Sequence, residues 1–215
     1  MDKKLALILG LLAFTIEPAT ADTPAPASKI KRIYDITRDG SKIGSDIVEI
    51  EKQGDVATVK FTTHVSVKIA FVEVYHMDRT SSETWNANQL VSFTSQTNDY
   101  GTKHVVAATA AGEKIHFDVD GKASDAPRKV VPNGIWSKAF LSSGQIFDDG
   151  TGKLLSIKVS DLGDETLTQH GVAQQTRHYH IAGDFERDLW FEGDTLVRLR
   201  MVGPDGSKVS SDLRP

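Results

Sequence analysis

The longest alternating run of apolar and polar residues spans residues 56–77 and reads VATVKFTTHVSVKIAFVEVYHM. Up to Phe71 the apolar side chains fall mostly on odd positions and the polar ones on even positions. Successive side chains of a strand point to opposite faces, so this pattern predicts a strand with one buried and one solvated face. At Val72 and Val74 the apolar phase moves to even positions. A one-residue slip in a continuous strand predicts a β-bulge, which bends the strand.

Shorter runs of the same kind cover most of the remaining chain, with glycine-containing turns between them. Asp39-Gly40 and Gly193-Asp194 are typical of hairpin turns, because these residue types accept positive φ angles. Many short strands separated by such turns predict an all-β, mainly antiparallel fold: a curved meander sheet forming a half-barrel or barrel. The other expected strands are 30–38, 42–52, 115–119, 155–159, 172–182, 186–192 and 195–202.

Two segments interrupt this pattern. Residues 122–134 show no alternation and contain Pro127 and Pro132, so we expect the longest loop there, between halves at about 30–120 and 150–213. Residues 133–141 are the best candidate for a short helix. Neither half would bury enough apolar surface alone, so we expect residues 30–215 to form a single antiparallel β domain.

The first residues have the order of a secretory signal peptide. Lys3 and Lys4 precede an apolar run over 5–16, and Ala-Thr-Ala at 19–21 places small residues before a cut ahead of Asp22. The run is too short for a membrane-spanning helix, which needs about 20 residues. We therefore expect a cleaved signal peptide at 1–21 and a disordered Pro/Ala-rich leader at 22–29. The mature protein would be periplasmic, with no integral membrane segment after signal removal.

Composition excludes several classes of function. The 215-residue chain has a formal net charge of −4 and lacks the basic footprint of a nucleic-acid-binding protein. It contains no cysteine, which excludes thiol catalysis, disulfide exchange and thiolate metal sites. A cysteine-free exported domain of this length fits a bacterial periplasm and a fold stabilised by its core. We expect no cofactor.

His178-Tyr179-His180 is the clearest candidate for metal chemistry. Residues two apart on a strand share a face, so both imidazoles could reach one metal ion. Such a site needs a third ligand, for which His170 and Asp188 are candidates without a diagnostic spacing. The alternative is that both histidines belong to a solvated strand face. We predict no metal site, and keep His178 and His180 as the weak candidates.

Other chemical signatures are incomplete. Glu186, Asp188 and Glu192 share a parity near Trp190, a pattern that fits either a glycan-acting hydrolase or an exposed strand face. Residues 118–121, Asp-Val-Asp-Gly, lack the remaining ligands of a calcium loop and predict a hairpin turn. No Gly-x-Ser-x-Gly elbow is present. We name no catalytic residue.

The aromatic and apolar residues suggest a core and a cavity. We expect Trp85, Trp136 and Trp190 to anchor packing, with a place at the mouth of a cavity as the alternative. If the sheet closes or half-closes, its concave face offers a site for an apolar ligand. The residues expected to line that face are Val65, Val67, Ile69, Ile115 and Phe117.

Several spaced elements along the chain carry a resemblance to a known family. They are Tyr34-x4-Asp39-Gly40-x3-Gly44; Tyr75; Glu83-x-Trp85; Leu90; Asp99-x-Gly101; Gly134-x-Trp136; Asp149-x-Thr151-Gly152-Lys153; Tyr179-x-Ile181-x-Gly183-Asp184; Asp188-Leu189-Trp190-Phe191; and Asp205-Gly206-Ser207. On these elements the chain resembles a family of uncharacterised exported bacterial β-sheet proteins, classed as a domain of unknown function. The resemblance implies an exported, mainly antiparallel β domain and supplies no catalytic residue. Where the family's usual pattern has Trp-Tyr, this chain has Trp190-Phe191.

Together these observations predict an exported periplasmic β protein rather than an enzyme. The expected role is a non-enzymatic binding module for a small apolar or lipid-like ligand, or for an envelope protein. The alternative is a metal- or glycan-dependent hydrolase that uses His178 and His180 or the Trp190 region.

Overall fold

The computed structural model describes residues 27–215, so the predicted signal peptide and most of the predicted leader lie outside the described residues. The described chain is almost entirely β structure, and its first strand begins at Ser28, within the predicted leader. None of its helices is long and apolar enough to cross a membrane. The elements are β1 (Ser28–Arg38), β2 (Ser41–Gln53), β3 (Val56–Ile69), β4 (Val72–Asn86), β5 (Gln89–Asp99), β6 (Thr102–Ala111), β7 (Lys114–Val119), β8 (Lys122–Pro127), β9 (Val131–Pro132), the 3-10 turn η1 (Ala139–Ser142), β10 (Gln145–Phe147), β11 (Leu154–Gln169), β12 (Val172–Gly183), β13 (Arg187–Glu192), β14 (Thr195–Val202) and β15 (Lys208–Leu213).

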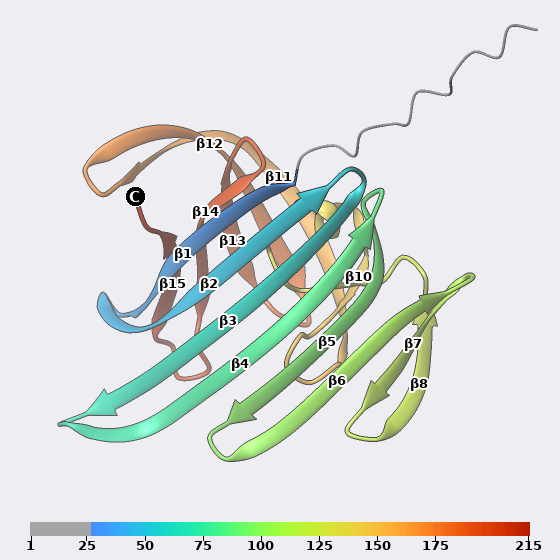
Figure 1. The fold of residues 1–215 in the computed structure, drawn as a ribbon. Coiled ribbons are helices and arrows are strands. Elements are labelled where there is room, and N and C mark those ends of the chain that lie inside the picture. Colours follow the sequence, from blue (N-terminus) through green and yellow to red (C-terminus); the bar gives the residue numbers. More distant parts are fainter. Residues whose placement is uncertain (1–26) are drawn as a thin grey trace, which may run out of the picture.

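All of these strands belong to one sheet, and the predicted antiparallel meander is confirmed. The order runs from β8 through β1 to β15 and on to β9, so β8 and β9 are free edges and the sheet does not close. Of the strand pairs in residues 27–215, only β9 and β10 are parallel. The first and last strands of the described residues pair with each other, β1 with β15, and Tyr34 lies opposite Leu213. Figure 1 shows the sheet folding back on itself, with β11 to β14 behind β1 to β5.

The run at 56–77 is two strands rather than one bulged strand. It turns at Ala70 and Phe71, whose φ angles are 46° and 70°, and Ile69 pairs with Val72. The predicted continuous strand was wrong, because a two-residue turn shifts the apolar parity by one, as a bulge does. No glycine or asparagine marks the turn. A register shift does occur nearby, between Val67 and Lys68 in the β3–β4 pair. Beyond it, odd-numbered residues of β3 lie opposite odd-numbered residues of β4, as in the pair Val67 and Tyr75.

Three further expectations need correction. The predicted loop at 122–134 contains strand β8, which is a sheet edge with mostly exposed side chains and therefore shows no apolar alternation. The predicted short helix at 133–141 is only the single 3-10 turn at Ala139–Ser142. The strand expected at 155–159 continues to Gln169, with a register shift at Asp161 and Gly163.

The core lies between the two layers and is completed by the inner segment, residues 128–153, which includes β9, η1 and β10. Phe147 of this segment is fully buried, with its ring centroid 4.9 Å from Phe93 and 5.0 Å from Phe117. Trp136 meets Trp85 edge to face at 5.7 Å. The inner segment therefore covers the part of the concave face that carries Trp85, Phe93 and Phe117.

Candidate functional site

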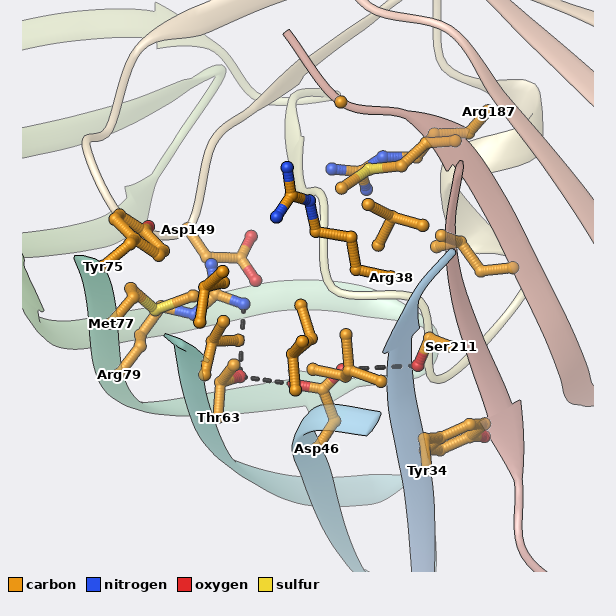
Figure 2. Close-up of a pocket in the computed structure, with 18 of the residues that line it drawn as sticks. Tyr34, Arg38, Asp46, Thr63, Tyr75, Met77, Arg79, Asp149, Arg187 and Ser211 are labelled. Atoms are coloured by element: carbon orange, nitrogen blue, oxygen red, sulfur yellow. Dashed lines mark hydrogen bonds between the residues drawn. The ribbon is translucent and has the colours of Figure 1, made fainter. Parts of the chain in front are cut away.

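A cavity of about 790 Å³ occupies the part of the concave face that the inner segment leaves open. Strands β1 to β4 form one wall, and β13 to β15 with the turn before β15 form the other. The inner segment also lines the cavity, with residues 133–135, 148 and 149. Figure 2 shows the side chains of both walls converging on this space. Most of them are apolar, and they include Ile36, Ile43, Val48, Phe61, Val65, Val67, Ile69, Val74, Met77, Ile135, Leu196, Leu199, Met201 and Val209.

The five residues expected to line the concave face fall into two groups. Val65, Val67 and Ile69 of β3 line the cavity. Ile115 and Phe117 of β7 belong to the buried core instead, under Phe147. All five face the concave side, but the inner segment covers β7, and alternation along a strand cannot show what covers it.

The entrance of the cavity lies beside the β3–β4 hairpin, which exposes apolar side chains. Ile69 and Val74 line the cavity and are 60% and 39% exposed. Phe71, at the tip, is 100% exposed, and Val72 next to it is also exposed. A bulky residue at positive φ is uncommon, because its Cβ approaches the backbone. The hairpin thus places an unburied aromatic ring next to the open end of an apolar cavity.

A hydrogen-bonded chain of polar side chains crosses the floor of the cavity. The Thr63 hydroxyl donates to Asp46 Oδ1 at 2.6 Å, and the Ser211 hydroxyl lies 3.5 Å from Asp46 Oδ2. Arg79 donates to Thr63 Oγ1 over a longer 3.4 Å. Figure 2 shows these three contacts linking β2, β3, β4 and β15. They hold the Asp46 carboxylate against both walls.

Three arginines line the same cavity, and their surroundings differ. Arg38 forms an ion pair with Asp205. Arg79 and Arg187 form no ion pair with any carboxylate of residues 27–215, and the Nε of each is buried without an acceptor there. The Arg187 guanidinium lies 4.6 Å from the Phe185 ring centroid. Burial lowers the pKa of Arg187 from its ordinary value, although the charge of Asp149 acts in the opposite direction.

Two buried carboxyl groups accompany these arginines. Asp149 lines the cavity, and burial raises its pKa to about 6, although the positive charge of Arg79 acts to lower it. Glu83 lies deeper, and burial together with the charge of Asp149 raises its pKa to about 8. Glu83 Oε2 accepts hydrogen bonds from Trp85 Nε1 at 2.6 Å and from Trp136 Nε1 at 2.8 Å. Because Trp136 is in the inner segment and Glu83 is in β4, this contact fixes the segment to the sheet.

His178 and His180 lie on the opposite, outer face of the sheet. Both imidazoles contact Asp188 Oδ1, at 3.1 and 2.9 Å, and His178 also lies 2.9 Å from Glu165. His178 stacks on Trp190 with 4.3 Å between ring centroids. The described residues include no group of three side chains suited to hold a metal ion. His170 does not join this cluster and contacts the Leu213 carbonyl oxygen instead.

The remaining sequence candidates have structural partners. Trp85, Trp136 and Trp190 are all buried, as expected. The residues at 118–121 form the β7–β8 turn, with the Gly121 N–H donating to Asp118 Oδ1 at 2.8 Å. Of the three acids near Trp190, Asp188 contacts the histidines, while Glu186 and Glu192 are exposed.

Sequence reasoning missed the polar end of the cavity. Arg187 shares its parity with buried Leu189, and Arg79 shares its parity with Glu83 and buried Trp85. That shared parity is the signal that would have placed both arginines on the inner face. It was hidden in β4, where polar residues occupy both faces from Asp78 to Thr84 and no apolar alternation marks the inner one.

Comparisons with known proteins agree with this architecture. A solved structure from Brucella abortus, described as a beta-barrel-like protein of domain of unknown function DUF1849, has a TM-score of 0.64 to this chain. The two are 12% identical, and the match covers 86% of this chain and 94% of that one, which is a likeness of fold alone. No curated protein matches the chain. The model of the family described as domain of unknown function (DUF6134) matches residues 34–214. The chain therefore belongs to the DUF6134 family, whose members share a domain of unknown function.

Proposed function

We propose that this protein binds an apolar, lipid-like ligand in the cavity between β1–β4 and β13–β15. The observation that carries the proposal is the cavity itself, about 790 Å³ with mostly apolar walls. Ligand sites of proteins typically measure about 300–1,000 Å³ and combine apolar walls with a few polar groups. Each methylene that leaves water for such a wall contributes about 0.8 kcal/mol, so an acyl chain is a suitable occupant.

The same proposal places the protein in the bacterial periplasm. The basic, apolar and small-residue order of residues 1–21 supports export through a cleavable signal peptide, with cleavage after Ala21. The absence of cysteine from the chain fits a bacterial periplasm better than an animal secreted module. A binding protein for lipid-like molecules would meet its ligand there, between two membranes.

The hydrolase alternative has less support. His178 and His180 face away from the cavity, and both contact Asp188. Their neighbour Trp190 is buried in a small cluster with Leu167 and Val197, so its ring is not presented to a glycan. An envelope protein as the partner is the outcome that remains if the cavity holds no small molecule.

The first test is native mass spectrometry of the full-length gene product purified from the periplasm, with organic extraction of the same sample. We expect the intact mass of a chain that begins at Asp22, together with the mass of a bound molecule that organic solvent extracts as a lipid. A protein that reproducibly carries no additional mass would count against ligand binding. An intact mass that retains residues 1–21 would count against export by cleavage.

A matched pair of variants tests the position of the ligand. Val67→Glu places a charge on the cavity wall, whereas Thr62→Glu places one on the solvated face of the same strand. Binding of the uncharged dye N-phenyl-1-naphthylamine, followed by fluorescence, should be lost in Val67→Glu and kept in Thr62→Glu. Equal binding by both folded variants would show that the dye lies elsewhere.

A further inference from the structure

Arg79 and Arg187 are the two cavity arginines that form no ion pair in the described chain, and Asp149 is the nearby carboxyl whose charge acts on both. The two arginines reach the cavity from β4 and β13, on opposite walls (Figure 2). The hydrogen bond from Arg79 to Thr63 is long, at 3.4 Å, and Arg187 makes none with residues 27–215. Each thus presents several N–H donors to a mostly apolar space.

A guanidinium in this environment needs an acceptor. An ionised group that leaves water without a partner loses several kcal/mol of hydration, so buried arginines are normally paired with carboxylates or phosphates. The planar fork of an arginine matches the two oxygens of such a group. Two unpaired forks in one apolar cavity therefore point to an anion supplied from outside the chain.

The other charged groups of the cavity are already engaged, with one exception. Arg38 pairs with Asp205, and Asp46 accepts from Thr63. Asp148 Oδ1 accepts from the backbone N–H groups of Gly150 and Thr151, at 3.1 and 2.9 Å. The exception is Asp149, whose Oδ1 is buried without a donor in the described chain. Burial raises its pKa to about 6, so this carboxyl can become neutral when an anion binds near it.

We propose that the ligand is an amphiphile with an anionic head, a carboxylate or a phosphate, which Arg79 and Arg187 bind while the acyl chain lies against β1–β4. This inference rests on the proposed function, because it assumes that the cavity binds a lipid-like molecule. It adds the chemistry of the head group and the two residues that select it.

The test compares ligands that share a chain and differ in head group. In the assay, dodecanoate, dodecyl phosphate and uncharged dodecanol are each titrated below their critical micelle concentrations into the mature protein with bound N-phenyl-1-naphthylamine. Displacement of the dye gives the affinity of each ligand. A charged hydrogen bond contributes about 1.5–3 kcal/mol, so the anionic ligands should bind roughly 10- to 100-fold more tightly than dodecanol. Inorganic phosphate alone should not compete at millimolar concentration.

Variants then assign the preference to residues. Arg79→Met and Arg187→Met should each remove most of the preference for an anionic head, measured as the ratio of the dodecanoate and dodecyl phosphate affinities to the dodecanol affinity of the same variant. Asp149→Asn should strengthen binding of the anionic ligands, because it removes a nearby negative charge. Arg200→Met is the control, since Arg200 lies over Trp190 on the outer face and should leave all three affinities unchanged.

The outcomes separate this inference from the proposed function. Equal affinities for the three ligands would overturn the anionic head and leave the apolar cavity supported. Binding of none of the three would overturn both. Competition by inorganic phosphate alone would show a free-anion site and overturn the amphiphile. If a Met variant fails to fold, the ranking of the three ligands on the unaltered protein still decides.

Discussion

The stability advantage of the Glu83→Gln variant over the unaltered protein should grow as the pH rises. Glu83 is a fully buried carboxyl group that is protonated in the folded protein. Its pKa lies at about 8, raised from 4.5 first by burial and then by the charge of Asp149. In the unfolded chain the same group ionises near its ordinary value. Between these two values folding requires uptake of a proton, so the stabilising effect of the protonated carboxyl is complete below pH 4.5 and is lost as the pH approaches 8.

The size of the effect follows from those two pKa values. Each pH unit between them lowers the free energy of unfolding by about 1.4 kcal/mol, which amounts to roughly 4 kcal/mol between pH 4.5 and 7.5. Glutamine keeps an oxygen that can accept from Trp85 Nε1 and Trp136 Nε1, and it does not ionise. The difference in the free energy of unfolding between Glu83→Gln and the unaltered protein should therefore be near zero at pH 4.5 and grow to roughly 4 kcal/mol at pH 7.5.

Urea unfolding followed by tryptophan fluorescence, at intervals from pH 4.5 to 8.5, measures this difference directly. Taking the difference between two proteins cancels the contributions of the titrating groups that do not interact with Glu83, and Asp149 is the interacting group whose titration changes with it. Glu49→Gln is the control, because Glu49 is exposed and pairs at the surface with Lys31, 3.1 Å away. Its difference curve should be flat and near zero. A flat curve for Glu83→Gln as well would mean that Glu83 ionises normally in the folded protein, and would refute the reasoning.

Two further predictions concern packing and the cavity entrance. Phe147→Ala removes a fully buried ring between Phe93 and Phe117 and should lower the free energy of unfolding by about 3–5 kcal/mol in urea; a loss below about 1 kcal/mol would mean that the inner segment contributes little to the core. The double variant Ala70→Asn with Phe71→Gly should raise the melting temperature by about 2–4 °C in calorimetry, since both positions have positive φ and Phe71 buries nothing; a fall would show that Phe71 has contacts in solution.

The strands with clear alternation could be predicted from the sequence, whereas β5, β6, β8 and β15 were not predicted, and the site was predicted only in part. Val65, Val67 and Ile69 were placed on the cavity wall by alternation alone, because the period of two is a property of the backbone. Ile115 and Phe117 show the limit of that argument. They share the concave side with the cavity residues, yet Phe147, from a segment expected to be loop and helix, packs over them.

The sequence by itself determined an antiparallel β fold and, for the strands that alternate, which side is apolar, because both follow from local backbone geometry and side-chain polarity. The tertiary structure decided where that apolar surface stays open. Pairing of β1 with β15 joins the two ends of the described chain, and the inner segment then fills one end of the concave face and leaves the other as a cavity. It also brought Arg79 and Arg187 together with no carboxylate paired to either in the described chain, which no local pattern encodes. Contacts between distant segments depend on how the whole chain folds back, whereas alternation describes only residues that are adjacent in the sequence.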